Sequence, residues 1–193
     1  MCGIAGLIDA SGRLAADARA DLAQAMTDRL VHRGPDAQGL WHDADAGIVL
    51  GHRRLSIVDL SPAGAQPMVS ASGRYVVSYN GEIYNWQALR ADLDARGAAP
   101  AWRGHSDTEV LLAGIDADGI EATLARLNGM FALALWDRGA RTLTLARDRM
   151  GEKPLYYGCR DGLFAFASEL KALALLPGLC GGIDADAVTA YLA

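Results

Sequence analysis

The chain opens with Met1-Cys2-Gly3-Ile4-Ala5-Gly6, and the apolar, glycine-punctuated run continues to Asp9. A short apolar segment of this kind predicts a buried strand at the very beginning of the chain. Cysteine is small enough at the second position to permit removal of the initiator methionine. The residue that would then lead the chain stands next to a core strand, so this stretch decides both the expected fold and the expected chemistry.

Cys2 would carry two functional groups on one residue after that removal. A free thiol has a pKa near 8.5 and an α-amine a pKa of about 7.7–8.0, so both titrate close to neutral pH. The amine can accept the thiol proton and later return it to a leaving group, while Gly3 leaves the approach to the sulfur open. A buried structural cysteine is the alternative interpretation, and position alone leaves both open.

The rest of the chain alternates between strand-like and helix-like stretches. Apolar spacing predicts one helix before Gly34 and another that ends at Gly97, and Ser106-Asp107-Thr108-Glu109 is typical of a capping box that begins a third. Strands are expected over residues 48–52, 75–79, 130–136, 142–146, 155–157 and 163–167. Residues 130–136 are apolar at every position, which indicates a strand covered on both faces. The pattern predicts an α+β fold with stacked layers in the order helix, sheet, sheet, helix.

Composition excludes several classes of protein. Of 193 residues, 51% are hydrophobic and 21% charged, with a net charge of −5, so the chain can form a core but lacks the basic excess of a nucleic-acid-binding or anionic-membrane-binding surface. No run reaches the roughly 18 apolar residues of a membrane span, and no secretory signal is present. Three irregularly spaced cysteines and four scattered histidines predict neither a disulfide framework nor a metal site. We expect a cytoplasmic protein.

Asn80-Gly81-Glu82 follows an apolar strand and offers donors for a developing negative charge. If a thiolate attacks a carboxamide, a tetrahedral oxyanion forms, and two donors must point at it. The Asn80 side-chain amide and the Gly81 backbone N–H are suitable. The same Asn-Gly pair is also the commonest signal for a hairpin turn, which is the alternative.

Three charged residues are candidates for holding a free amino acid. The guanidinium of Arg54 can bind both oxygens of an α-carboxylate, and Glu82 and Asp107 can bind an α-ammonium. Each has a simpler explanation. Arg54 can be a solvated charge, and Asp107 can stabilise the N-terminus of a helix through the macrodipole.

Other polar residues are assigned less specific places. His52 precedes Arg53 and Arg54, and a loop or surface position is expected for it rather than contact with the site. We expect Cys159 and Cys180 to be structural cysteines rather than reactive ones.

Several longer motifs run in one order over nearly the whole chain. They are Met1-Cys2-Gly3-Ile4-Ala5-Gly6, His32-Arg33-Gly34-Pro35-Asp36, Arg54-Leu55-Ser56-Ile57-Val58-Asp59, Asn80-Gly81-Glu82-Ile83-Tyr84-Asn85, Ser106-Asp107-Thr108-Glu109, Gly129-Met130-Phe131-Ala132, and Asp148-Arg149-Met150-Gly151 followed by Lys153-Pro154-Leu155-Tyr156-Tyr157. With this ordered set the sequence resembles the glutaminase domain of glutamine-dependent asparagine synthetases, which are class II glutamine amidotransferases.

The resemblance implies a four-layer α/β/β/α sandwich of the N-terminal-nucleophile hydrolase type, with two antiparallel sheets. It implies Cys2 as nucleophile, with its own amine as base, and an oxyanion hole formed by Asn80 and Gly81. It further implies a glutamine site in which Arg54 holds the α-carboxylate and Glu82 and Asp107 hold the α-ammonium. Backbone groups of Leu55 and Val58 would line the same pocket. The expected products are glutamate and ammonia, formed by way of a γ-glutamyl thioester.

The same resemblance predicts the domain organisation. Residues 1–180 are expected to form the glutaminase domain, and residues 181–193 to begin a connector to an ATP-dependent synthetase domain outside this chain. That domain holds pyrophosphate with a Ser-Gly-Gly-x-Asp-Ser loop, whereas Cys180-Gly181-Gly182-Ile183-Asp184-Ala185 lacks both serines. No cofactor is therefore expected in this chain, and ATP and Mg²⁺ are expected only in the synthetase domain. Expected partners are L-glutamine and that domain, and a homodimer stays open.

The leading hypothesis is hydrolysis of glutamine that supplies ammonia for asparagine synthesis from aspartate. Two alternatives stay open. One is a related amidotransferase with another carboxylate acceptor, and the other is a non-catalytic module that retains the fold. A further hypothesis is that residues 148–157 face the synthetase domain and help to shape an ammonia route.

Overall fold

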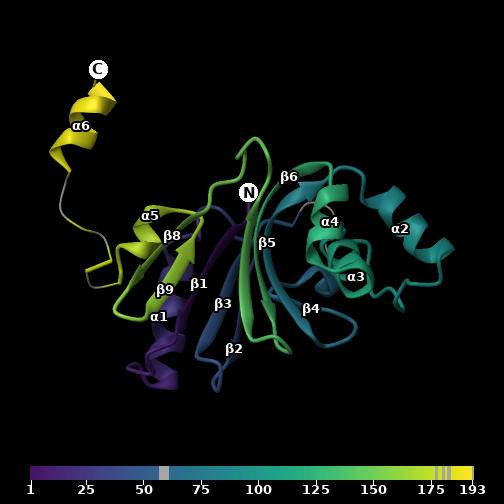
Figure 1. The fold of residues 1–193 in the computed structure, drawn as a ribbon, viewed down its shortest axis with the longest axis horizontal. Coiled ribbons are helices and arrows are strands. Elements are labelled where there is room, and N and C mark those ends of the chain that lie inside the picture. Colours follow the sequence, from purple (N-terminus) through teal and green to yellow (C-terminus); the bar gives the residue numbers. More distant parts are fainter. Residues whose placement is uncertain (57–60, 177, 180, 182–183, 193) are drawn as a thin grey trace.

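Two antiparallel sheets packed face to face form the centre of the molecule in the computed structural model, which describes residues 1–56, 61–176, 178–179, 181 and 184–192 (Figure 1). One sheet has five strands in the order β2-β3-β1-β9-β8, and the other has four in the order β4-β5-β6-β7. The strands are β1 (Gly3–Asp9), β2 (Ala37–Asp43), β3 (Ile48–Arg54), β4 (Met68–Val69), β5 (Tyr75–Ile83), β6 (Gly129–Asp137), β7 (Thr142–Arg147), β8 (Tyr156–Arg160) and β9 (Leu163–Ala167).

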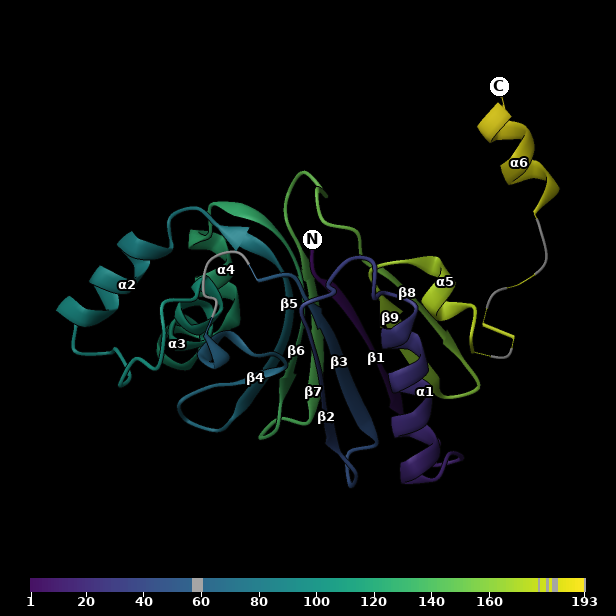
Figure 2. The ribbon, with the colours of Figure 1, turned by 180° about the vertical axis from the view of Figure 1, so that it is seen from behind.

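Helices cover the outer face of each sheet, as the two opposite views show (Figures 1 and 2). Helices α1 (Ala16–Asp28) and α5 (Leu170–Leu173) lie on the five-stranded sheet. Helices α3 (Asp107–Asp118) and α4 (Ile120–Arg126) lie on the four-stranded sheet, and α2 (Trp86–Ala95) packs against α3. A 3₁₀ turn, η1 (Pro62–Gly64), precedes β4, and α6 (Ala185–Leu192) follows the layers. The predicted α+β arrangement of four layers is present.

Three apolar clusters correspond to the three spaces between these layers. The cluster between α1 and the five-stranded sheet includes Leu7 and Met26, and the cluster between α3 and the four-stranded sheet includes Leu111 and Leu133. The third lies between the sheets and contains Trp136, which is 1% exposed. Because β6 contributes side chains to two of these clusters, its uniformly apolar sequence is explained.

Most of the predicted elements are present, with small shifts at their ends. The strands over residues 48–52 and 75–79 extend to Arg54 and Ile83, and the last two strands are β8 and β9. The Ser106 hydroxyl accepts a hydrogen bond from the backbone N–H of Glu109 at 3.2 Å, as expected at a helix start. Strands β2 and β4 and helices α4 and α5 were missed. Strand β2 is an edge strand with little burial, so it lacks the apolar signal of the core strands.

Two hydrogen bonds join the sheets directly at the level of β3 and β5. The Ser78 hydroxyl donates to the Gly51 carbonyl at 2.9 Å, and Nε2 of His52 lies 3.0 Å from the Tyr79 carbonyl, to which it can only donate. His52 is fully buried between the sheets, so the expectation of a loop or surface position was wrong. Its strand alternates, and His52 lies on the same inner face as Ile48 and Leu50.

His52 makes stability depend on pH. Burial, reinforced by the charge of Arg54, lowers the pKa of His52 from 6.5 to about 4, although the bond to the Tyr79 carbonyl acts in the opposite direction. Between these values the unfolded chain binds a proton that the folded chain excludes, so stability falls as the pH drops from 6.5 towards 4. Each pKa unit corresponds to about 1.4 kcal/mol, so the full difference is about 3 kcal/mol.

We expect His52→Gln to reduce this dependence, because the Gln amide can still donate to Tyr79 but does not titrate. Urea unfolding of both proteins from about pH 4 to about pH 7 measures the effect, and the parent should lose about 3 kcal/mol more than the variant over that range. Equal slopes for the two proteins would contradict the prediction.

Candidate functional site

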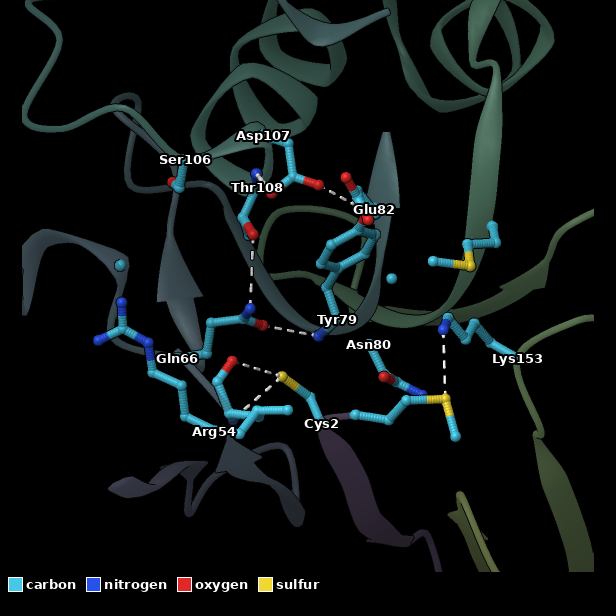
Figure 3. Close-up of a pocket in the computed structure, with 15 residues that line it drawn as sticks. Cys2, Arg54, Gln66, Tyr79, Asn80, Glu82, Ser106, Asp107, Thr108 and Lys153 are labelled. Atoms are coloured by element: carbon cyan, nitrogen blue, oxygen red, sulfur yellow. Dashed lines mark hydrogen bonds between the residues drawn. The ribbon is translucent and has the colours of Figure 1, made fainter. Parts of the chain in front are cut away.

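A cavity of about 90 Å³ opens between the start of β1 and the end of β5. This volume is several times the roughly 10–15 Å³ that one water molecule requires. The candidate residues that line it are Cys2, Arg54, Leu55, Asn80, Gly81, Glu82 and Asp107. In Figure 3, Arg54 and Lys153 lie on opposite sides, Cys2 and Asn80 lie between them, and Glu82 and Asp107 close the remaining side. Val58 lies outside the described residues.

The Cys2 thiol is held against the backbone that follows β3. The N–H of Leu55 lies 3.4 Å from Sγ, and Sγ lies 3.6 Å from the carbonyl oxygen of Leu55. Burial raises the pKa of the Cys2 thiol, and the Leu55 N–H, the positive N-terminus and Arg54 only partly offset that rise. The sulfur is therefore well positioned but largely protonated near neutral pH, so it needs a proton acceptor to react.

Arg33 fixes the backbone of Cys2 from the other side. Its Nε donates to the Cys2 carbonyl at 3.0 Å, and its Nη1 pairs with Glu169 at 2.9 Å. Glu169 also contacts His32 and Lys171. Partial burial alone would raise the pKa of Glu169, but the hydrogen bonds from Arg33, Lys171 and His32 outweigh it and lower the pKa to about 2. We did not single out Arg33 from the sequence, although it stands in the His32–Asp36 motif next to the N-terminal strand.

Asn80 presents an unused donor to the cavity. It lies on β5 with its side chain on the face towards the other sheet, as Val76 and Ser78 do. The residue is 1% exposed, and its Nδ2 has no hydrogen-bond partner among the described residues. A buried amide donor without a partner costs free energy, so this group is ready to bind an acceptor from the cavity.

The backbone N–H of Gly81 points the same way for a reason that lies in the strand pairing. Both backbone groups of Phe131, its partner on β6, bond to Asp148, so Gly81 and Phe131 form a pair without hydrogen bonds between them. The Gly81 N–H therefore faces away from β6. On the same side of β5, the N–H of Tyr79 donates to Oε1 of Gln66 at 2.7 Å, and the N–H of Ile83 donates to Oδ2 of Asp107 at 3.0 Å.

Gly81 cannot carry a side chain here. A Cβ atom would lie 2.4 Å from the Met130 carbonyl oxygen and 2.7 Å from Cβ of Phe131. The glycine is thus required by the close approach of β6, and its N–H remains directed at the cavity.

Asp107 is a buried carboxylate at the start of α3. Its Oδ2 accepts from the Tyr79 hydroxyl at 2.9 Å and from the Ile83 N–H at 3.0 Å, and its Oδ1 accepts from the Thr108 N–H at 2.9 Å. Burial raises the pKa of Asp107 more than these donors lower it, and the charge of Glu82 adds to the rise. Two carboxylates therefore face one small space, an arrangement that favours a cationic ligand.

Arg54 and Gln66 form the opposite wall. Nη1 of Arg54 donates to the Ser61 carbonyl at 3.0 Å. Gln66 accepts from the Tyr79 N–H through Oε1 and lies 3.4 Å from the Thr108 hydroxyl through Nε2, so it ties the segment before β4 to β5 and α3. The sequence analysis missed Gln66, because nothing in its neighbourhood distinguishes it from a solvated glutamine.

Comparison with known proteins assigns the chain to a family. The family model described as glutamine amidotransferase domain matches residues 1–193. The chain belongs to the glutamine amidotransferase domain family. The prediction of a glutamine amidotransferase enzyme is therefore confirmed at the level of the family.

Individual relatives support the same assignment. The chain is 39% identical to asparagine synthetase [glutamine-hydrolyzing] 3 of Bacillus subtilis over 95% of its length, and 43% identical to a putative asparagine synthetase [glutamine-hydrolyzing] of Mycobacterium bovis over 94%. It covers 29% of each relative. The resemblance to asparagine synthetases is confirmed, and the chain spans less than a third of their length.

A solved structure confirms the fold. Glutamine phosphoribosylpyrophosphate amidotransferase from B. subtilis, complexed with ADP and GMP, superposes with a TM-score of 0.72 and 21% identity. The match covers 90% of this chain and 43% of that one. The predicted four-layer α/β/β/α sandwich with two antiparallel sheets is therefore confirmed.

Three further expectations concern cysteines, metals and membranes. Cys159 is exposed on β8 rather than buried in a structural position, and Cys180 lies outside the described residues. Within the described part of the chain, no three metal-ligating side chains are grouped closely enough to hold an ion. Among the same residues, no helix has both the length and the apolar character needed to cross a membrane.

Because Cys2 is partly buried, we expect its thiol to react slowly in the chain that retains Met1. Iodoacetamide should alkylate the exposed Cys159 faster than Cys2, because the Cys2 thiol is partly buried and has a raised pKa. Peptide mass spectrometry of timed samples measures both rates, and unfolding in urea should remove the difference. Faster modification of Cys2 in the folded chain would contradict the prediction.

Proposed function

We propose that this chain hydrolyses L-glutamine to glutamate and ammonia, with Cys2 as the nucleophile after removal of Met1. The observation that carries the proposal is the pair of donors beside the sulfur. The Asn80 Nδ2 and the Gly81 N–H both face the cavity that Cys2 lines. They are suited to the oxyanion that forms when a thiolate attacks a carboxamide.

The proposed reaction begins with proton transfer from Sγ to the α-amine of Cys2. The sulfur attacks the amide carbon of glutamine, and the carbonyl oxygen takes up the negative charge between Asn80 and Gly81. The proton passes to the leaving nitrogen, ammonia departs, and a γ-glutamyl thioester remains. A water molecule then hydrolyses the thioester and restores the thiol. The raised pKa of the thiol explains why a base so close to the sulfur is needed.

The charges around the cavity fit the other end of a glutamine molecule. In the proposed complex, the guanidinium of Arg54 binds the α-carboxylate, and Glu82 and Asp107 bind the α-ammonium. Backbone groups of Leu55 and Val58 complete the pocket in this proposal. The Tyr79 hydroxyl donates to Asp107 and helps to keep that carboxylate charged, which binding of an ammonium requires.

We further propose that the ammonia supplies asparagine synthesis from aspartate in a longer polypeptide. Residues 1–180 would form the glutaminase domain, and residues 181–193 would begin the connector to a synthetase domain that binds ATP and Mg²⁺. Support comes from the relatives named asparagine synthetase, because this chain covers only 29% of the length of each.

Another carboxylate acceptor is the second candidate. A relative from Gibberella zeae named amidase chry2 is 37% identical over 93% of this chain. The two candidates share the glutamine chemistry and differ only in the acceptor. Feeding the full-length polypeptide with aspartate, ATP and Mg²⁺ and analysing the products for asparagine separates them.

Replacing Cys2 by alanine should abolish glutamate release while the fold persists. The variant Cys159→Ala is the matched control, because it removes an exposed thiol that does not line the cavity and should retain full activity. Glutamate is measured by coupled dehydrogenase assay, folding by circular dichroism, and the N-terminus of each protein by mass spectrometry. Undiminished turnover by a folded Cys2→Ala protein would overturn the proposed function.

Arg54→Lys should raise KM for glutamine by about tenfold or more, because an ammonium cannot replace two charge-assisted hydrogen bonds. Arg53→Lys is the control. Arg53 directly precedes Arg54 on β3, but its side chain points to the opposite face of the sheet and bonds to Asp28 and to the Thr27 carbonyl. Steady-state kinetics of both variants tests the assignment, and equal KM values would contradict it.

A further inference from the structure

Lys153 is a buried cation that the reaction above does not use. The residue is 6% exposed and lines the same cavity as Cys2 and Asn80 (Figure 3). An ammonium that is withdrawn from water without a counter-charge costs free energy. The burial of this charge beside the cavity therefore suggests that Lys153 has a role in the site.

The loop after β7 holds Lys153 in this position by its backbone. The carboxylate of Asp148 accepts from the N–H groups of Lys153 at 3.1 Å, of Glu152 at 3.0 Å and of Met150 at 3.1 Å. Nε of Arg147 donates to the Lys153 carbonyl at 2.6 Å. Burial alone would raise the pKa of Asp148, but these donors outweigh it and lower the pKa. The loop is thus closed around the Asp148 carboxylate, which together with Arg147 fixes the backbone of Lys153 beside the cavity.

The only polar contact of the Lys153 ammonium among the described residues is the thioether of Met1, with Nζ 3.3 Å from Sδ. No carboxylate oxygen of those residues lies within ion-pair distance of Nζ. A thioether is a weak acceptor and does not compensate a charge. Sδ is joined to the Cys2 nitrogen through only the Cγ, Cβ, Cα and carbonyl carbon of Met1. The ammonium of Lys153 therefore contacts the residue that is bonded directly to the Cys2 nitrogen, and this nitrogen would become the free α-amine.

We propose that Lys153 is a positioning residue whose charge keeps the α-amine of Cys2 in its neutral, proton-accepting form near neutral pH. The inference rests on the proposed function. Two ammonium groups repel each other, so the second loses its proton more readily when the first stays charged. An unprotonated amine is what the attack of Sγ requires.

Other charges also face this part of the cavity and set the background against which Lys153 acts. They are Arg54 at the end of β3, Glu82 on β5 and Asp107 at the start of α3. Tyr79 also lines the cavity, and burial raises the pKa of its hydroxyl, so it stays uncharged near neutral pH. Arg33 is not a lining residue but bonds to the Cys2 carbonyl. The two carboxylates favour a protonated amine and the two guanidinium groups disfavour it. Lys153 shifts this balance towards the neutral amine.

The test is the pH dependence of kcat/KM for glutamine in protein verified to lack Met1. The acid limb of that profile reports the base of the free enzyme. Lys153→Met should move the limb upward by about half a pH unit to one unit, because the amine then holds its proton to higher pH. Lys153→Arg keeps the charge and should leave the limb in place. Arg138→Met, which removes an exposed positive charge at the β6–β7 turn, is the control for net charge.

A direct measurement of the amine complements the kinetics. In Cys2→Ser protein without Met1, the rate of N-terminal acetylation against pH gives the α-amine pKa, and adding Lys153→Met should raise it by the same amount. A loss of activity that is equal at all pH values, with an unmoved limb and an unchanged acetylation profile, would overturn the proposal and leave glutamine hydrolysis intact. Absence of glutaminase activity in the parent chain would instead overturn the proposed function.

Discussion

The site depends on how the two sheets are fixed to each other near β3 and β5. The cysteine stands at the start of one sheet and the donors stand on the other, so sliding of the sheets by one residue would separate them. The bonds from Ser78 to Gly51 and from His52 to Tyr79 prevent this, because they connect neighbouring residues of both strands across the core. Since His52 pairs with Ile4 in the ladder, the same contact sets the height of Cys2 against Asn80.

On the edge of β5 that faces away from β6, the backbone N–H groups of Tyr79, Gly81 and Ile83 follow one another. Its N–H groups at Tyr79 and Ile83 are bound by Gln66 and Asp107, which themselves line the cavity. The intermediate N–H, that of Gly81, is left for an acceptor from the cavity. One strand therefore shapes the walls and supplies a donor, and the neighbouring Asn80 supplies another from its opposite face. The oxyanion site that we propose would be rigid, because it would consist of sheet backbone and a packed side chain.

The sequence predicted the layers, the main strands and the residues that meet in the cavity, because apolar periodicity and the ordered motifs are local signals. It included His52 in a predicted strand but expected a loop or surface position for its side chain, which is in fact buried in the core. It also missed Arg33 and Gln66, whose contacts join segments far apart in the chain. Edge strand β2 was missed because few of its side chains are buried, so its sequence does not show the apolar pattern of a core strand.

Burial and charge have opposite effects on the nucleophile, and the arrangement of charges resolves the conflict. Desolvation protects the Cys2 thiol from water but raises its pKa, which suppresses the thiolate. Placing more positive charge directly at the sulfur would stabilise the thiolate and also lower its nucleophilicity. In the proposed mechanism, Lys153 lies beside the N-terminus instead, so that the sulfur keeps its intrinsic reactivity and a larger fraction of the neighbouring amine is neutral and able to act as the base. In this proposal the site gains a proton acceptor without lowering the nucleophilicity of the sulfur.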